Sequence, residues 1–182
     1  MAPSPHPQLT HVGIYARDLA TMEAFYTKVL GLIVSDRGSG MTFKNDFVFM
    51  SAKPGTHHQL VMASGRPPQG ASTVNQLSFK VDTLDELKEM HRRVDQSPAT
   101  NLRPVNHGNA LSLYFDDPEG NTVEIYMDTQ WHVPQPHAVK LDFALPNDAI
   151  LAETEARCRA TPGFMPMEAY KEVMAKRLAA QG

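Results

Sequence analysis

Four polar residues recur at one fixed spacing in the chain, and their side chains are of kinds that bind metal ions. His11 precedes Gln76 by 65 positions, and Gln59 precedes Glu124 by the same step. An imidazole nitrogen, an amide oxygen and a carboxylate oxygen can together hold a divalent cation. If the two copies face each other, the spacing predicts that the four residues converge on one cleft, where three of them can bind a metal ion.

Each of these residues also has an ordinary structural interpretation. A single histidine at an inward strand position, such as His11, is often a hydrogen-bonded core residue. Periodicity alone allows Glu124 to point into solvent, and it favours a solvent-facing Gln76. An inward carboxylate without a partner is costly. The metal hypothesis therefore requires Glu124 to point inward and to have a partner there.

The elements that must position these residues repeat as well. Each copy opens with a β-rich run, continues at once into an amphipathic helical period, and ends in three short strand-like runs. The expected strands are residues 9–16, 32–36, 41–50 (bulged at 45–46), 57–63, 74–82, 101–105, 110–116 and 121–128, and the expected helices are residues 18–30 and 83–95. A glycine-rich turn is expected at residues 37–40.

This repeat predicts an α+β fold in which paired βαβββ modules form a cup-shaped mixed sheet. The expected boundaries are residues 1–8 for a disordered lead-in, 9–65 and 74–128 for the two modules of one domain (9–128), 64–72 for a linker rich in Pro and Gly, and 129–182 for an extended segment followed by C-terminal helices near 147–160 and 166–179. We expect this tail to cap the domain or to contact another subunit rather than to carry catalysis.

The composition argues against several classes of partner. The chain has 182 residues, a formal net charge of −3 and one cysteine, Cys158. This balance gives no electrostatic reason to bind nucleic acid or an anionic membrane, and no stretch is long and apolar enough to cross a bilayer. A single cysteine suits a reducing compartment. We therefore expect a cytoplasmic protein that acts on a small molecule and assembles as a homodimer or higher homo-oligomer.

Three segments carry the pattern of a known family. They are His11-Val12-Gly13-Ile14 with the helix after it, the pair His57-His58 before Gln59, and the run from Leu113 to Ile125, which contains Asp-Pro-Glu-Gly-Asn. Over about residues 9–128 the chain resembles the vicinal oxygen chelate superfamily, which includes glyoxalase I, bleomycin- and fosfomycin-resistance proteins and type I extradiol dioxygenases. The resemblance implies paired βαβββ modules around a cup, in agreement with the repeat.

Within that superfamily the chain looks most like the extradiol dioxygenases, which cleave catechol rings with O₂ at an iron(II) centre. The resemblance implies that His58 is the acid/base of the pair His57-His58, and that Tyr114 and His107 orient the substrate phenolate. Strict strand alternation raises one conflict, because His58 and Gln59 should then point to opposite faces and only one can face the cup. The dioxygenase hypothesis requires that one to be His58.

The resemblance implies that His11, Gln76 and Glu124 hold the metal ion, and that Gln59 lines the cup without binding it. One position departs from the dioxygenase pattern, because Gln76 stands where the resemblance implies a second histidine ligand. An amide oxygen binds iron more weakly than imidazole does, so iron(II) remains favoured but Mn, Zn or Ni become possible. Two other functions stay open. One is a glyoxalase-type isomerase or lyase with a redox-silent divalent metal, and the other is a metal-free binding protein of the resistance type.

Overall fold

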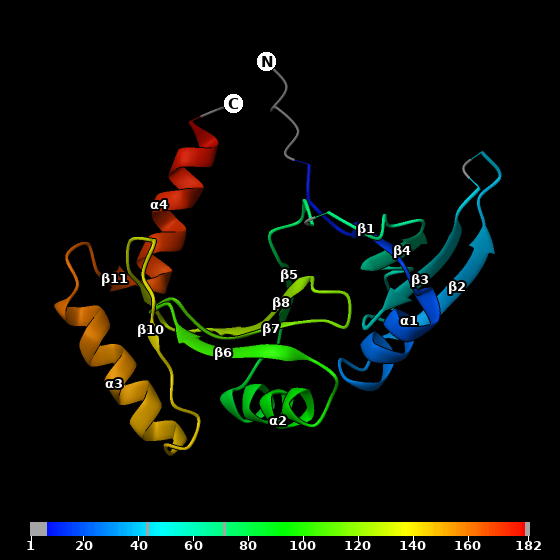
Figure 1. The fold of residues 1–182 in the computed structure, drawn as a ribbon. Coiled ribbons are helices and arrows are strands. Elements are labelled where there is room, and N and C mark those ends of the chain that lie inside the picture. Colours follow the sequence, from blue (N-terminus) through cyan, green and yellow to red (C-terminus); the bar gives the residue numbers. More distant parts are fainter. Residues whose placement is uncertain (1–6, 43, 71, 181–182) are drawn as a thin grey trace.

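Two main sheets, each covered by one helix, make up the body of the protein in the computed structural model, which describes residues 7–42, 44–70 and 72–180 (Figure 1). The first sheet has the order β1 (Val12–Ala16), β4 (Leu60–Ser64), β3 (Asp46–Ser51) and β2 (Ile33–Ser39), and α1 (Leu19–Lys28) contacts it. The second has the order β10 (Val139–Lys140), β6 (Thr100–Asn106), β7 (Ala110–Asp116), β8 (Thr122–Asp128) and β5 (Leu77–Lys80), with α2 (Leu84–Asp95) against it. The predicted α+β class with paired βαβββ modules is confirmed.

Local sequence signals explain both module helices. The Asp18 side chain accepts a hydrogen bond from the backbone N–H of Thr21 at the start of α1, and Thr83 and Glu86 form a capping box at the start of α2. Such caps satisfy backbone donors that the first helical turn leaves free. Gly31 follows α1 with a φ of 75°, a conformation that glycine adopts without strain.

The β2–β3 hairpin differs from its prediction. Residues 37–39, expected in a turn, belong to β2 and pair with β3, and the turn follows at Gly40, whose N–H donates to the carbonyl of Asn45. The bulge lies on β2 between Val34 and Asp36 rather than at residues 45–46. Residues 1–6 of the expected lead-in, Phe43 of the expected strand, Ala71 of the linker and residues 181–182 of the tail lie outside the described residues.

The two modules pair their strands in slightly different register. β1 and β4 are parallel, and Val12 lies opposite Leu60, 48 positions on. The equivalent Leu77 of β5 lies opposite Val123 of β8, only 46 positions on. The register shift places Val61, not Gln59, at the position in the first module that Glu124 occupies in the second. The sequence repeat therefore overstates the equivalence of Gln59 and Glu124.

One turn joins the modules through buried polar groups. Asp117 is 3% exposed, and its carboxylate accepts hydrogen bonds from the Tyr26 hydroxyl at 3.0 Å, from the Asn121 side-chain amide, and from the backbone N–H groups of Glu119 and Asn121. Burial and the neighbouring Asp117 carboxylate raise the pKa of Tyr26 well above its ordinary value. Because Tyr26 lies on α1, the β7–β8 turn fixes the first module against the second.

The C-terminal tail covers one edge of the second sheet, on the far side from the first module (Figure 1). Its elements are β9 (Trp131–His132), β10, α3 (Asn147–Ala160), β11 (Met165–Pro166) and α4 (Met167–Ala179), so the predicted helical extension is confirmed. The Asn106 amide on β6 donates a buried hydrogen bond of 2.7 Å to Thr154 on α3. Within the part of the chain that the structure describes, no helix is long and apolar enough to cross a membrane.

We expect the Asp117 carboxylate to contribute strongly to stability. Asp117→Ala leaves several buried donors without an acceptor, so the free energy of unfolding should fall by about 3 kcal/mol, and Tyr26→Phe, which removes one neutral donor, by about 1 kcal/mol. Chemical denaturation followed by circular dichroism measures both. Asp128→Ala is the matched control, since Asp128 forms an exposed ion pair with Lys80 that should be worth about 0–1 kcal/mol. Equal losses for Asp117→Ala and Asp128→Ala would contradict this role.

Candidate metal centre

Histidines of the first module gather on the sheet face opposite α1. His11 directly precedes β1, and its ring centroid lies 4.4 Å from that of His58. The ring of Phe49, from β3, packs edge-on against His58 with centroids 5.2 Å apart. Burial, and then the neighbouring His11 and His57, lower the pKa of His58 below its ordinary value. His58 is therefore biased toward the neutral imidazole that a general base requires.

The structure places His58, and not Gln59, beside His11. β4 begins only at Leu60, so His58 and Gln59 precede the regular strand and do not follow its alternation. The side-chain oxygen of Gln59 accepts a hydrogen bond of 3.0 Å from the backbone N–H of Ala52. Gln59 is thus engaged by its own loop, and the expectation that it lines the cleft has no support from its contacts.

His58 is also linked to the edge of the sheet through His57. The Nδ1 atoms of His57 and His58 are 2.9 Å apart, and Nε2 of His57 lies 3.2 Å from Oδ2 of Asp36 on β2. A shallow cavity of about 550 Å³ adjoins this row of hydrogen-bonded side chains. It is lined by Asp36, Arg37, Gly38, Ser39, Gly40, Phe47, Phe49 and His57. A small molecule has room to approach the histidines from this side.

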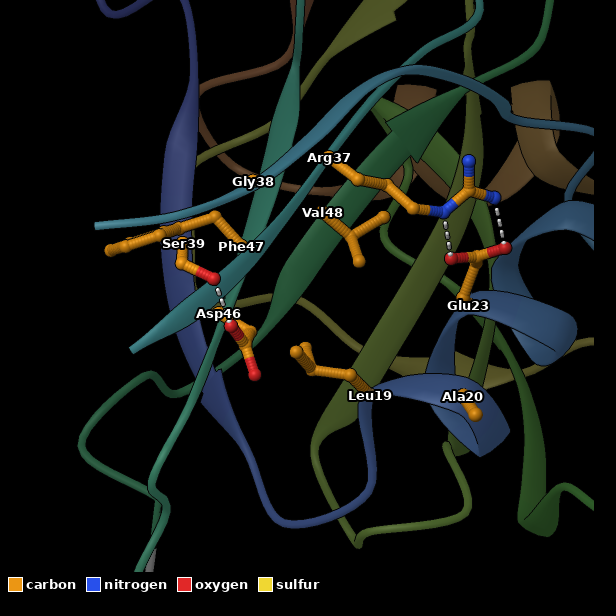
Figure 2. A pocket seen from close by; sticks show the side chains of 9 residues that line it. All are labelled: Leu19, Ala20, Glu23, Arg37, Gly38, Ser39, Asp46, Phe47 and Val48. Carbon is orange, nitrogen blue, oxygen red and sulfur yellow. Dashed lines mark hydrogen bonds and ion pairs between the residues drawn. The ribbon is translucent and has the colours of Figure 1, made fainter. Parts of the chain in front are cut away.

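The opposite face of the same hairpin carries a second cavity, of about 420 Å³, between the hairpin and the start of α1 (Figure 2). Its charged groups bind one another. Arg37 makes a bidentate ion pair with Glu23, and the Ser39 hydroxyl donates to Asp46 at 2.6 Å. Because these charges are already paired, we do not regard this cavity as the reactive site.

The second module holds its polar residues around a buried carboxylate. Glu124 is 7% exposed, and its Oε2 accepts hydrogen bonds from the Gln76 amide at 2.8 Å and from the Ser78 hydroxyl at 2.6 Å. Its other oxygen, Oε1, receives no hydrogen bond from a described residue. Glu124 therefore points inward, and it keeps one oxygen available for a ligand.

Tyr114 and His107 lie beside this carboxylate. Tyr114 is directly opposite Glu124 on the neighbouring strand, and burial, followed by the close approach of the Glu124 carboxylate and its charge, raises the pKa of Tyr114. Nδ1 of His107 lies 2.7 Å from the carbonyl oxygen of His137, and Nε2 lies 3.1 Å from the Tyr114 hydroxyl. A carbonyl can only accept, so Nδ1 carries the proton and, in the neutral ring, Nε2 accepts from Tyr114.

Sequence reasoning missed three contributors to these groups. Ser78 shares a strand face with Gln76, so alternation could have indicated it. Phe49 and the backbone carbonyl of His137 come from segments distant in sequence, and no local pattern signals them. His137 belongs to the tail, which therefore supports a candidate site residue in addition to capping the domain.

The donor set suits a metal only if Gln76 takes part. Among the described residues, no three His, Cys, Asp or Glu side chains lie together closely enough to hold an ion. The structure brings Gln76 and Glu124 together, but His11 makes no hydrogen bond or ion pair to either. The free Oε1 of Glu124, the amide oxygen of Gln76 and Nε2 of His11 are nevertheless one carboxylate, one amide and one imidazole donor, a combination that divalent cations accept.

Comparison with known proteins agrees with this fold. The chain is 27% identical over 177 residues to biphenyl-2,3-diol 1,2-dioxygenase 3 of Rhodococcus globerulus, which spans 91% of this chain and 83% of that protein. A glyoxalase/bleomycin resistance protein/dioxygenase domain from Frankia aligns with a TM-score of 0.58 at 21% identity, over 69% of this chain and all of that one. The manganese complex of the fosfomycin resistance protein FosX from Listeria monocytogenes aligns with a TM-score of 0.54 at 18% identity, over 69% and 95%.

A match to a family model identifies the superfamily. Residues 8–125 match the family described as the Glyoxalase/Bleomycin resistance protein/Dioxygenase superfamily. That stretch contains the first module, the second module as far as the middle of β8, and every candidate ligand, and it ends before the C-terminal tail. The resemblance seen in the sequence is thereby confirmed, and the chain belongs to this superfamily.

Proposed function

We propose that this protein is a metal-dependent enzyme that cleaves a catechol ring next to its two hydroxyl groups, inserting both atoms of O₂ into the product. The observation that carries the proposal is the arrangement around Glu124, a buried carboxylate with one oxygen held by Gln76 and Ser78 and the other free, beside the Tyr114–His107 pair. The similarity to a biphenyl-diol dioxygenase over 91% of the chain supports the same reaction.

His11, Gln76 and Glu124 would hold the metal ion, and iron(II) is the ion we favour. When bound, such an ion supplies a Lewis acid for the two catechol oxygens and, as iron, a path for electrons from the substrate to O₂. Ser78 donates a hydrogen bond to Oε2 of Glu124, and the second oxygen, Oε1, remains available to the ion. The protein thereby orients its carboxylate before any ligand arrives.

His58 acts as the general base and acid in this proposal. Its lowered pKa favours the neutral ring, which can take the proton of a catechol hydroxyl and return it later. Tyr114 donates its hydroxyl proton to Nε2 of His107, and this hydrogen bond holds the phenol beside the substrate oxygens. Burial raises the pKa of Tyr114 still further above neutral pH, so Tyr114 acts as a hydrogen-bonding group and not as a base.

A glyoxalase-type isomerase or lyase is the second candidate. The observation that favours it is Gln76, whose neutral amide supplies an oxygen donor where an imidazole would bind iron more firmly. Mn, Zn or Ni would then replace iron, and the same residues would move protons on a substrate with neighbouring oxygens. The two candidates differ in their need for O₂.

We also expect the active form to be a cytoplasmic homodimer or higher homo-oligomer. The exposed ring of Tyr15 and the absence of buried side chains on α4, within the part of the tail that the structure describes, leave surface for a second subunit. Sedimentation of the metal-stripped and reloaded protein would measure the assembly.

The first experiment is metal analysis of protein purified without oxygen, followed by oxygen-electrode assays with catechol and 2,3-dihydroxybiphenyl. We expect about one ion per chain, and one O₂ consumed for each substrate molecule as a yellow product appears. Glu124→Gln should lose most of its metal, because it removes the charged ligand. Iron-loaded protein that consumes no O₂ would rule out ring cleavage. Conversion of another substrate with neighbouring oxygens, in the absence of O₂, would favour the isomerase.

His58→Gln should lower kcat for ring cleavage by about 100-fold or more, since general acid–base groups contribute on this scale, with little change in metal content. Steady-state kinetics measure kcat, and elemental analysis measures the metal. His91→Gln provides the matched control, because His91 packs against Phe143 at α2, away from the candidate centre. Full activity in His58→Gln would contradict its role.

Gln76→His should raise the affinity for iron(II) by about 10-fold or more, because imidazole replaces a weaker oxygen donor. Competition with a chelating dye under anaerobic conditions measures this affinity. Gln59→His adds the same imidazole where the native side chain only accepts from Ala52, so its affinity should match the native protein. An unchanged affinity in Gln76→His would show that residue 76 is no ligand.

A further inference from the structure

Two residues without a role in the proposed reaction form a hydrogen-bonded chain that ends on His58. Asp36 lies 3.2 Å from Nε2 of His57, and Nδ1 of His57 lies 2.9 Å from Nδ1 of His58. The ring of Phe49 packs against both imidazoles, with centroid distances of 5.8 Å to His57 and 5.2 Å to His58. The carboxylate, the two imidazoles and the supporting ring thus form one cluster on the open face of the first sheet.

A strand irregularity is what puts Asp36 into this cluster. Val34 pairs with Met50, whose side chain is fully buried on the α1 side of the sheet. In a regular strand Asp36 would share the face of Val34, because alternate residues point the same way. The bulge between them instead sets Asp36 opposite Phe49, and Arg37 then faces α1, where it binds Glu23. Bulges often redirect a side chain beside a functional site.

The donors and acceptors of this chain can be assigned from its outer end. An ionised carboxylate only accepts hydrogen bonds, so Nε2 of His57 must carry a proton. In the neutral ring, Nδ1 of His57 is then an acceptor, and the proton between the two rings belongs to Nδ1 of His58. The remaining nitrogen of His58, Nε2, keeps its lone pair. Free histidine prefers the opposite tautomer, with the proton on Nε2. The hydrogen bonds from Asp36 through His57 therefore reverse the ordinary preference at His58.

We propose that Asp36 and His57 are positioning residues, which hold His58 in the Nδ1–H tautomer and so leave its Nε2 free to accept a proton. The tautomer itself is a property of the metal-free protein, and only its catalytic consequence rests on the proposed function. Because the hydrogen bond at one ring nitrogen sets the state of the other, the first histidine of the His57-His58 pair has a defined task.

The test is nuclear magnetic resonance of the ¹⁵N-labelled, metal-free protein at a pH of about 8, where histidines of ordinary pKa are neutral. Long-range ¹H–¹⁵N correlation distinguishes a protonated ring nitrogen from an unprotonated one. We expect His58 to show a protonated Nδ1 and an unprotonated Nε2, and His57 the reverse. A native His58 with its proton mainly on Nε2 would overturn the proposal.

Variants separate this role from general support of the fold. His57→Phe keeps a ring against Phe49 but removes the acceptor, so His58 should revert to the Nε2–H tautomer. His57→Asn keeps an oxygen acceptor near the position of Nδ1 and should preserve Nδ1–H. Asp36→Ala should weaken the preference, whereas Asp46→Ala, which removes a carboxylate from the opposite face of the same hairpin (Figure 2), should not. A His58 tautomer that is the same in His57→Phe and the native protein would overturn the proposal.

Kinetics provide the second readout. His57→Phe should lower kcat for ring cleavage by about 10-fold, with KM changed less than twofold, and His57→Asn should recover most of that loss. A fall in KM and kcat together, with no recovery in His57→Asn, would indicate a merely structural role and contradict the proposal. If the native protein cleaves no catechol, the proposed function fails, and the resonance measurements still decide the tautomer.

Discussion

The buried carboxylate of Asp117 is the interaction on which the rest of this structure depends. It receives the Tyr26 hydroxyl from α1 of the first module and three further hydrogen bonds from its own turn in the second. Next to it, Glu119 accepts the backbone N–H groups of Arg17 and Asp18, where β1 leads into α1. The candidate ligands come from different modules, His11 from one and Gln76 with Glu124 from the other. No hydrogen bond joins His11 to Gln76 or Glu124, so their relative placement relies on the hydrogen bonds that Asp117 and Glu119 accept from the first module.

Local signals in the sequence were enough to predict the fold class and most elements. The helical period after each opening strand and the spacing of the repeat both correspond to observed features, and the structure adds the caps at Asp18 and Thr83. The errors fall where pairing between strands overrides local pattern. Residues 37–39 look like a turn, yet pairing with residues 46–48 of β3 makes them a strand. The two-residue difference in register between the modules is likewise set by packing, which a repeat in sequence does not record.

In the candidate site, too, local pattern predicts some residues and tertiary contacts decide the others. Alternation allows the inward Glu124 carboxylate, but by itself it favours a solvent-facing Gln76 and does not assign Ser78 a role, whereas in the structure both side chains donate to Glu124. The position of His58 could not be predicted in this way, because it precedes β4 and escapes the alternation. Asp36 reaches the histidines through a bulge, and His107 is held by a carbonyl 30 residues away in the tail. Each of these contacts depends on tertiary structure that only the folded chain provides.

Glutamine at position 76, in place of the histidine of the dioxygenase pattern, would leave the charge of the proposed metal centre unchanged. Glutamine and neutral histidine carry the same formal charge, so a divalent ion held with one glutamate keeps a net charge of about +1 with either. Its electrostatic attraction for two neighbouring substrate oxygens is therefore retained. What changes is the donor atom, from nitrogen to oxygen, and with it the preference among metals. A centre of this charge would thus still chelate a diol or hydroxy-ketone, while redox chemistry with O₂ would depend on which ion fills it. If the proposed function holds, the choice between ring cleavage and isomerisation would follow from the metal that is bound, and Gln76 would be the ligand that biases this choice.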